Sequence, residues 1–186
     1  KSPGIPDNST VIIKLIDKGV HVISEIEYAA RYTNAKLICV TGSNGKTTTV
    51  SLIYHILKSA GLNVAIAGNI GVSFAKQVAE ERYDYYVLEL SSFQLEGLYE
   101  FKADIAVLLN ITPDHLNRHH TMENYIKAKE DITKNQTADD FCVLNYEDEV
   151  LRNFAEKCPA KVIFFSSRRV LDEGFYLDGE EIMYAH

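Results

Sequence analysis

The sequence TGSNGKTTT, at residues 41–49, decides the fold of this chain. An apolar run at residues 37–40 directly precedes it and is typical of a buried strand, and a helix is predicted over residues 46–60, ending before Gly61. Glycines let a strand-to-helix turn fold tightly, so its N–H groups point at phosphate oxygens, and the helix N-terminus adds its positive dipole end. The stretch therefore predicts a phosphate-binding loop.

The side chains of this loop indicate a bound nucleotide. Lys46 would reach the outer phosphates, and the Thr47 hydroxyl would ligate Mg²⁺. The loop is shorter than the standard one, because two residues rather than four separate Gly42 from Gly45. An ordinary glycine-rich turn is the alternative, but such a turn does not need Lys-Thr after its second glycine. The predicted cofactor-binding residues are Gly42, Ser43, Asn44, Gly45, Lys46, Thr47 and Thr48.

Outside the loop, short apolar runs alternate with helical segments. This pattern predicts an α/β fold with a P-loop-type, mostly parallel sheet flanked by helices, whose ligands bind beyond the carboxyl ends of the strands. A C-terminal β-hairpin is expected around Asp178-Gly179. Strands are predicted at 20–23, 37–40, 62–67, 85–90, 105–109, 141–144, 162–165, 174–177 and 181–184, and helices at 10–17, 24–32, 46–60, 72–80, 121–134 and 148–156.

Composition narrows the class of protein. The chain has 186 residues, 46% of them apolar, and a net charge of -7, which argues against a nucleic-acid partner or an anionic membrane surface. No apolar run approaches the roughly 18 residues of a membrane span. The three cysteines, Cys39, Cys142 and Cys158, share no C-x-x-C spacing. We therefore expect a cytoplasmic protein without a disulfide framework or zinc ribbon.

Two polar residues lie at or just past the ends of predicted strands, where ligands are expected to bind. Glu89 ends an apolar strand, where a carboxylate is costly unless it is paired or bound to metal. A structural pairing with the next loop is the alternative. His115 lies just past another strand end and could ligate a metal, but His119 and His120 are rivals that spacing alone does not separate.

Lys129 lies on the apolar stripe of the helix predicted at 121–134. It is three residues from both Ile126 and Ile132, which places it on the buried side. A desolvated lysine loses its charge readily, and a neutral amine can react with carbon dioxide to give an anionic carbamate that ligates metal. On spacing alone, a lysine whose stem packs on the core and whose head reaches solvent is favoured.

Five motifs together resemble the Mur ligase family of ATP-dependent amide ligases of peptidoglycan synthesis. They are TGSNGKTT at 41–48, GNIG at 68–71, LELSSFQLE at 88–96, NITPDHLNR at 110–118 and YIKAK at 125–129. The resemblance implies that residues 34–186 form the ATP-binding central domain, incomplete at its C-terminal end. Residues 1–33 would then be a linker from an N-terminal UDP-binding domain plus lead-in helices. The first residue is Lys1 rather than Met, which also suggests an excerpt of a longer protein.

The resemblance also implies a role for each site residue. Lys46 and the loop backbone would hold the phosphates of ATP. Thr47 and Glu89 would bind one Mg²⁺, and His115 with carbamylated Lys129 would bind a second. The catalytic set is then Lys46, Glu89, His115 and Lys129, and the substrate-binding set is Asn69, Ser91 and Gln94.

The ligases of this family that add other amino acids differ at the segment SSFQ, residues 91–94. This segment therefore determines which substrates the resemblance implies. They are UDP-N-acetylmuramoyl-L-alanine and D-glutamate, joined through an acyl phosphate with release of ADP and phosphate. The chain alone is expected to be inactive. A sister ligase of the same family, a folylpolyglutamate synthase-like ligase and a non-catalytic nucleotide-binding module are the alternatives.

Overall fold

The computed structural model describes residues 1, 4–6 and 8–186. Residues 2, 3 and 7 of the linker predicted within residues 1–33 lie outside the described residues, and the role of this segment as a connection stays a prediction. Among the described residues, no helix combines the length and the apolar character that crossing a bilayer requires.

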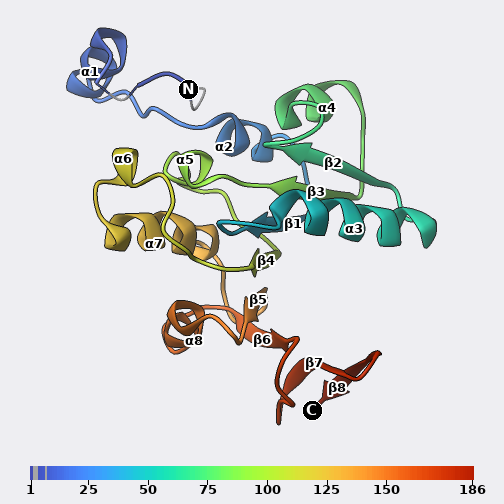
Figure 1. Cartoon of the computed structure of the whole chain (residues 1–186). Helices are drawn as coiled ribbons and strands as arrows, with labels where there is room; N and C mark the ends of the chain where they lie inside the picture. Colours follow the sequence, from blue (N-terminus) through green and yellow to red (C-terminus); the bar gives the residue numbers. More distant parts are fainter. Residues whose placement is uncertain (2–3, 7) are drawn as a thin grey trace.

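The centre of the fold is an eight-stranded sheet in the order β2-β3-β1-β4-β5-β6-β7-β8. Its strands are β1 (Lys36–Thr41), β2 (Val64–Gly68), β3 (Tyr85–Glu89), β4 (Ile105–Leu108), β5 (Phe141–Asn145), β6 (Lys161–Ser166), β7 (Gly174–Asp178) and β8 (Glu181–Ala185). Neighbouring strands are parallel except β7 and β8, which form the antiparallel C-terminal hairpin (Figure 1). The predicted fold class is confirmed.

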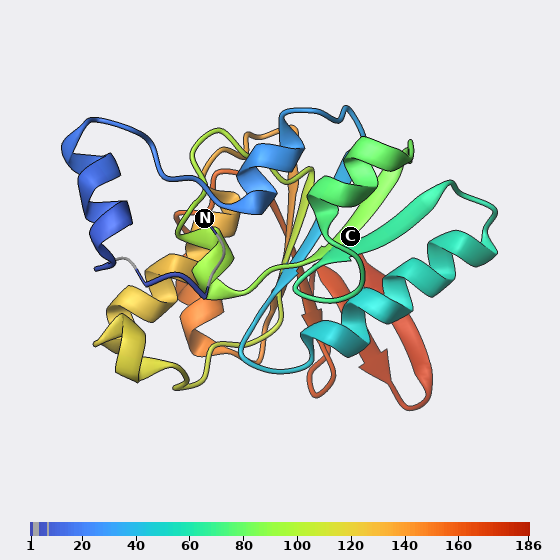
Figure 2. The same cartoon turned by 90° about the horizontal axis from the view of Figure 1, so that it is seen from above.

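Helices cover both faces of this sheet. They are α1 (Thr10–Asp17), α2 (Glu25–Ala30), α3 (Lys46–Ser59), α4 (Phe74–Glu80), α5 (Ser92–Leu95), α6 (Leu116–His119), α7 (Met122–Glu130) and α8 (Glu149–Ala155), and the 3-10 helix η1 (Asp131–Thr133) follows α7. In both views α1 and α6 lie at one end of the molecule and the C-terminal end of α3 lies at the other (Figure 1, Figure 2).

Alternate residues of β1 belong to two different cores. Leu37 and Cys39 join a large apolar cluster to which α2, α4, α5, α7 and α8 contribute. Ile38 and Val40 join a smaller cluster on the opposite face, which α3 covers through Val50. Because successive side chains of a strand point to opposite faces, a strand covered on both sides needs an unbroken apolar run. Residues 37–40 supply that run, which is why this segment forms an inner strand.

Three segments differ from the sequence prediction. The strand predicted at 20–23 is wrong, because no described strand lies beside these residues to complete a ladder of hydrogen bonds. The short helices α5 and α6 were not predicted, since four residues are too few to show a helical period. The helix predicted at 121–134 is shorter, because its last turn tightens into η1.

A buried carboxylate ties α2 to the segment that follows α5. Glu27 is 0% exposed, and it accepts hydrogen bonds from the backbone N–H groups of Tyr99 (2.9 Å) and Phe101 (2.9 Å) and from Arg31 Nη2 (2.9 Å). Burial by itself raises the pKa of Glu27, but these hydrogen bonds outweigh burial and hold the pKa below its usual value of 4.5. The charged form of Glu27 therefore stabilises the fold.

Glu27→Gln is expected to lower the free energy of unfolding by roughly 2 to 4 kcal/mol at neutral pH, because an amide replaces a charged acceptor of several hydrogen bonds. Since the folded-state pKa is lowered, this stabilisation is present above pH 4.5 and is lost as the pH falls through the folded pKa. Urea denaturation at pH 7 and at pH 3 measures the difference. Glu100→Gln, at a side chain that is 80% exposed, is the matched control and should change little.

Candidate active site

Loops from four strands meet at one edge of the sheet. The loop at 42–45 follows β1, Asn69 follows β2, Ser91 follows β3, and the segment 109–115 follows β4. β1 lies between β3 and β4, so the chain crosses from one side of β1 to the other at this point. Such switch points, beyond the carboxyl ends of parallel strands, are where ligands bind in open α/β sheets.

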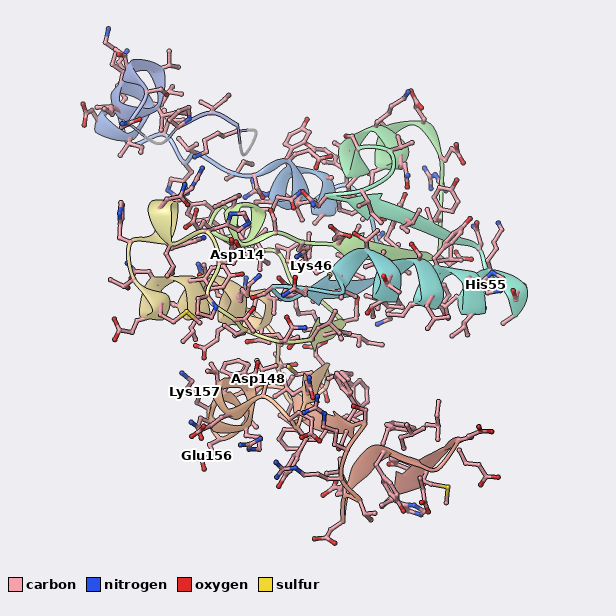
Figure 3. All side chains as sticks on the ribbon, viewed as in Figure 1. Lys46, His55, Asp114, Asp148, Glu156 and Lys157 are labelled. Carbon is pink, nitrogen blue, oxygen red and sulfur yellow. The ribbon has the colours of Figure 1, made fainter. Side chains whose placement is uncertain are left out.

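The phosphate loop has the backbone that its sequence predicts. Gly45 has a φ of 83° and caps the N-terminus of α3, a conformation that favours glycine. Lys46 Nζ donates to two carbonyls of its own loop, Gly42 at 2.9 Å and Ser43 at 3.0 Å. Lys46 lies at the start of α3, whereas His55 lies toward the other end of this helix (Figure 3). The lysine is thus already positioned over the loop that would hold phosphate.

Hydrogen bonds fasten this loop to two neighbouring segments. Ser43 is buried, and its Oγ accepts from the backbone N–H of Thr112 at 2.9 Å and lies 3.0 Å from Tyr125 Oη. Asn44 and Asn110 exchange two hydrogen bonds between backbone and side chain, at 2.9 and 3.0 Å. No local sequence pattern predicts these contacts, because their partners lie 66 or more residues apart.

Glu89 is paired with two of the other predicted site residues. Its side chain is 2% exposed, Oε2 accepts from Thr47 Oγ1 at 2.7 Å, and Oε1 accepts from Asn69 Nδ2 at 2.9 Å. Mg²⁺ prefers hard oxygen ligands and usually takes one or two carboxylates together with phosphate oxygens. A hydroxyl and a carboxylate brought together next to the phosphate loop fit that preference. The structure therefore places Thr47 and Glu89 where they could hold a magnesium ion.

Lys129 is buried together with its amino group. The residue is 2% exposed, and Nζ donates to the carbonyl of Gly42 at 2.8 Å and lies 4.7 Å from the centre of the Tyr125 ring. Burial, and secondarily the positive charge of Lys46, lower the pKa of Lys129 from 10.5 to about 7. The predicted burial is confirmed, and the alternative in which the head reaches solvent is wrong. A large neutral fraction at physiological pH suits an amine that is to react with carbon dioxide.

The three candidate histidines have different surroundings. His115 is exposed on the loop after β4, with a φ of 52°, and its Nε2 lies 3.4 Å from Asp114 Oδ2. His119 is buried, and its two ring nitrogens face Ser92 and Glu96. His120 is exposed. Because both nitrogens of His119 have partners and the residue is buried, His119 is the least suited of the three to bind a ligand.

The predicted metal ligands do not form a compact cluster of the usual ligating residues. Over residues 1, 4–6 and 8–186, no group of three or more His, Cys, Asp and Glu side chains could hold a metal ion. The predicted second site consists of one histidine, His115, and one modified lysine, Lys129, so it depends on the carbamate. The role of His115 stays a prediction.

Two of the predicted substrate-binding residues also stabilise α5. Ser91 caps this helix, with its Oγ accepting from the Gln94 backbone N–H at 3.4 Å, while Gln94 Oε1 accepts from the Ser91 N–H at 3.0 Å. This reciprocal pair is a capping box. Gln94 is buried, whereas Asn69 is exposed beside Glu89. Their contacts with substrate stay a prediction.

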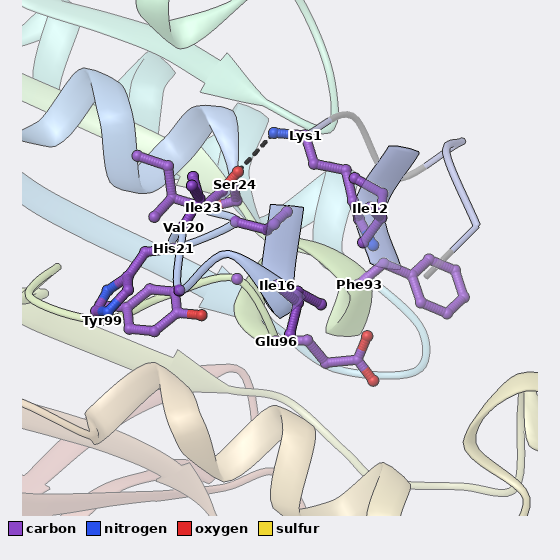
Figure 4. A pocket seen from close by; sticks show the side chains of 13 residues that line it. Lys1, Ile12, Ile16, Val20, His21, Ile23, Ser24, Phe93, Glu96 and Tyr99 are labelled. Carbon is purple, nitrogen blue, oxygen red and sulfur yellow. Dashed lines mark hydrogen bonds between the residues drawn. The ribbon is translucent and has the colours of Figure 1, made fainter. Parts of the chain in front are cut away.

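A cavity of about 520 Å³ lies beside α5 (Figure 4). Its walls come from α1, from the segment 19–24 that follows α1, and from the region around α5, including Phe93 and Tyr99. None of the residues of the phosphate loop lines it. Its volume is adequate for a small ligand, but the groups suited to phosphate chemistry lie elsewhere, at the carboxyl ends of β1 and β3.

The fold and the arrangement of this site are those of a known enzyme class: the chain belongs to the Mur ligase family. Residues 40–176 match the Mur ligase middle domain. The matched stretch contains the phosphate loop and Glu89, His115 and Lys129. The family resemblance seen in the sequence is thereby confirmed.

Curated relatives carry a more specific name. The UDP-N-acetylmuramoylalanine–D-glutamate ligase of Bacteroides fragilis is 55% identical over 186 residues, covering 98% of this chain and 42% of that protein. The protein of the same name from Bacteroides thetaiotaomicron is 56% identical over 185 residues, with the same shares covered. The chain thus spans 42% of the length of these relatives.

Solved structures share the fold at low sequence identity. MurF ligase from Thermotoga maritima, in complex with ADP, has a TM-score of 0.63 and 23% identity, covering 86% of this chain and 39% of that one. A UDP-N-acetylmuramate:L-alanyl-gamma-D-glutamyl-meso-diaminopimelate ligase from Neisseria has a TM-score of 0.69 and 18% identity, covering 97% and 62%. At these identities the likeness concerns the fold.

Proposed function

We propose that this chain is the ATP- and Mg²⁺-binding part of a ligase that joins D-glutamate to UDP-N-acetylmuramoyl-L-alanine. The observation that carries the proposal is the pairing of Thr47 with Glu89 at 2.7 Å, directly beside a phosphate loop whose lysine is in place. The identity of 55% to relatives of that name supports the choice of substrates. Residues 34–186 would form the ATP-binding unit, and residues 1–33 would connect it to a UDP-binding part.

In the proposed reaction, the alanyl carboxylate attacks the γ-phosphate of ATP, and ADP leaves. The D-glutamate amine then displaces phosphate from the resulting acyl phosphate. An anionic carboxylate must approach an anionic phosphate, so the site has to supply positive charge. Lys46 supplies one charge when it exchanges the carbonyls of Gly42 and Ser43 for phosphate oxygens. Mg²⁺ held by Thr47 and Glu89 would neutralise further phosphate charge.

Lys129 and His115 are proposed to hold a second magnesium ion. For this role the neutral amine of Lys129 forms a bond to the carbon of carbon dioxide and loses a proton to solvent, which leaves an anionic carbamate. The lowered pKa, about 7, supports this step, because only the neutral amine is nucleophilic. The carbamate would give α7 an anionic ligand without an Asp or Glu at this position.

Titration calorimetry with MgATP tests the nucleotide part of the proposal. Lys46→Ala should weaken MgATP binding about 100-fold, a loss of roughly 2.7 kcal/mol. Lys58→Ala is the matched control, because Lys58 is an exposed residue in the last turn of the same helix. Equal affinities of the wild type and Lys46→Ala would refute phosphate binding by this loop.

Phosphate release by the natural full-length protein tests the substrates. Release should require UDP-N-acetylmuramoyl-L-alanine and D-glutamate together, and the other amino acids of the stem peptide should not replace D-glutamate. Release driven by another amino acid would identify a sister ligase instead. MgATP binding without any substrate-dependent release would identify a non-catalytic nucleotide-binding module.

A further inference from the structure

His119 joins two segments of the site that are distant in sequence. It lies in α6, is 4% exposed, and its Nε2 is 2.9 Å from Ser92 Oγ in α5. Its Nδ1 lies 3.2 Å from Glu96 Oε1, at the C-terminal end of α5. One buried ring therefore contacts both ends of α5.

The aromatic ring of Phe93 strengthens this junction. The rings of Phe93 and His119 are stacked, with centroids 5.5 Å apart and an interplanar angle of 7°. The guanidinium of Arg118 lies 4.4 Å from the centre of the same Phe93 ring, and the His115 ring lies 5.1 Å from it. Phe93 thus packs against three residues of the segment that carries the candidate metal ligand His115.

α5 depends on such contacts for its position. It has only four residues, and a helix of that length is not stable alone, since nucleation is unfavourable. Its capping box, formed by Ser91 and Gln94, shapes the turn but does not fix where the turn lies relative to the β4 loop. Leu95 anchors α5 in the large core, and His119 is the buried side chain that joins both ends of α5 to the segment after β4.

We propose that His119 is a positioning residue, which holds the substrate-binding face of α5 at a fixed place relative to the loop after β4. The proposal rests on the proposed function, in which Ser91 and Gln94 contact the UDP-linked substrate. Loss of the two nitrogen contacts would loosen α5 and weaken binding of that substrate. ATP binding would change less, because Ser43 and Asn44 of the phosphate loop bond to Thr112 and Asn110, which precede α6, and not to α5.

Steady-state kinetics of the natural full-length protein test this proposal. His119→Phe keeps a ring for the Phe93 stack but removes both nitrogens, and it should raise the KM for UDP-N-acetylmuramoyl-L-alanine about tenfold, while the KM for ATP changes less than about twofold. His119→Gln can still reach Ser92 and should recover part of the loss. His55→Phe, an exposed position on α3, is the matched control and should leave both constants unchanged.

Hydrogen exchange of the backbone amides, measured on the same proteins, tests the positioning role of His119 independently of the proposed function. In His119→Phe, the backbone amides of α5 should exchange faster, while those of α3 should not. If the wild type shows no ligation, the proposed function fails, and the exchange result still decides the positioning role. Equal rises of both KM values would indicate general destabilisation. That outcome, or unchanged exchange in α5, would overturn the proposal.

Discussion

Replacing Lys129 with methionine is expected to stabilise the protein at neutral pH and, in the full-length protein, to abolish ligation. Lys129 is 2% exposed, and its pKa falls from 10.5 in the unfolded chain to about 7 in the folded one. Folding at pH 7 therefore costs free energy for desolvating or deprotonating the amine, which methionine of similar volume avoids. We expect a gain of about 2 kcal/mol or more, reduced by the lost hydrogen bond to Gly42.

The same residue makes stability depend on pH. Between pH 7 and 10.5 the unfolded chain keeps the lysine proton that the folded chain has released, so the unfolding free energy of the wild type rises with pH. The slope is about 1.4 kcal/mol per pH unit, and it is present below pH 10.5 and lost as the pH falls below 7. Urea denaturation at pH 7, 8 and 9 in buffer free of carbon dioxide measures it.

The matched control for Lys129→Met is Lys127→Met. Lys127 lies on the same helix, α7, but is exposed, so its replacement should change neither the slope nor the stability at pH 7. In the full-length protein, phosphate release by Lys129→Met should fall by a factor of about 1,000 or more if the carbamate holds a metal ion against the transferring phosphate. A stabilised variant that still ligates would show that the amine is dispensable.

Glu89→Gln is expected to reduce turnover of the full-length protein by a factor of about 100 to 1,000 and to raise the Mg²⁺ concentration needed for half-maximal activity. Glutamine keeps the shape of the side chain but removes the charge that faces Thr47 at 2.7 Å. An amide has one accepting arm, which can keep the contact with Asn69, while its NH₂ arm can only donate to the Thr47 hydroxyl and offers no oxygen to a metal ion there.

Magnesium titrations of phosphate release, with far-UV circular dichroism as a check of folding, measure the effect of Glu89→Gln. Glu123→Gln is the matched control, because Glu123 is exposed in the first turn of α7. We expect its Mg²⁺ dependence to equal that of the wild type. A Glu89→Gln protein with an unchanged titration would remove Glu89 from the metal site.

Much of the fold could be predicted because local patterns and global packing agree. The apolar run at 37–40 and the glycines at 42 and 45 specify a strand, a turn and a helix start within ten residues. The segment 20–23 is apolar at three of its four positions, yet it forms no strand. A strand is stable only when a neighbouring strand forms hydrogen bonds with its backbone. A pattern within four residues does not show whether such a neighbouring strand exists.

The candidate site was harder to predict, because its residues meet across the sheet. Spacing placed Lys129 on the buried stripe, but whether its head reaches solvent depends on the carbonyl of Gly42, 87 residues away. Setting His119 aside among the three histidines depended on Ser92 and Glu96, which contact its two nitrogens and lie 27 and 23 residues before it in the sequence. The buried Glu27 gave no signal, since the N–H groups that it accepts from lie 72 or more residues further on.

All four loops of the candidate site leave the carboxyl ends of the strands, so none of them lies at the opposite end of the strands. The turn that joins α3 to β2 lies at that opposite end, and Ala60 and Gly61 in it are exposed. Open space surrounds Gly61, where no atom lies within 4 Å of the position that a Cβ would take, although its φ of 80° requires that the glycine itself be kept. Exposed turns of this kind tolerate inserted sequence. An epitope tag or a fluorescent reporter inserted between these two residues would therefore sit at the far end of the strands from the nucleotide.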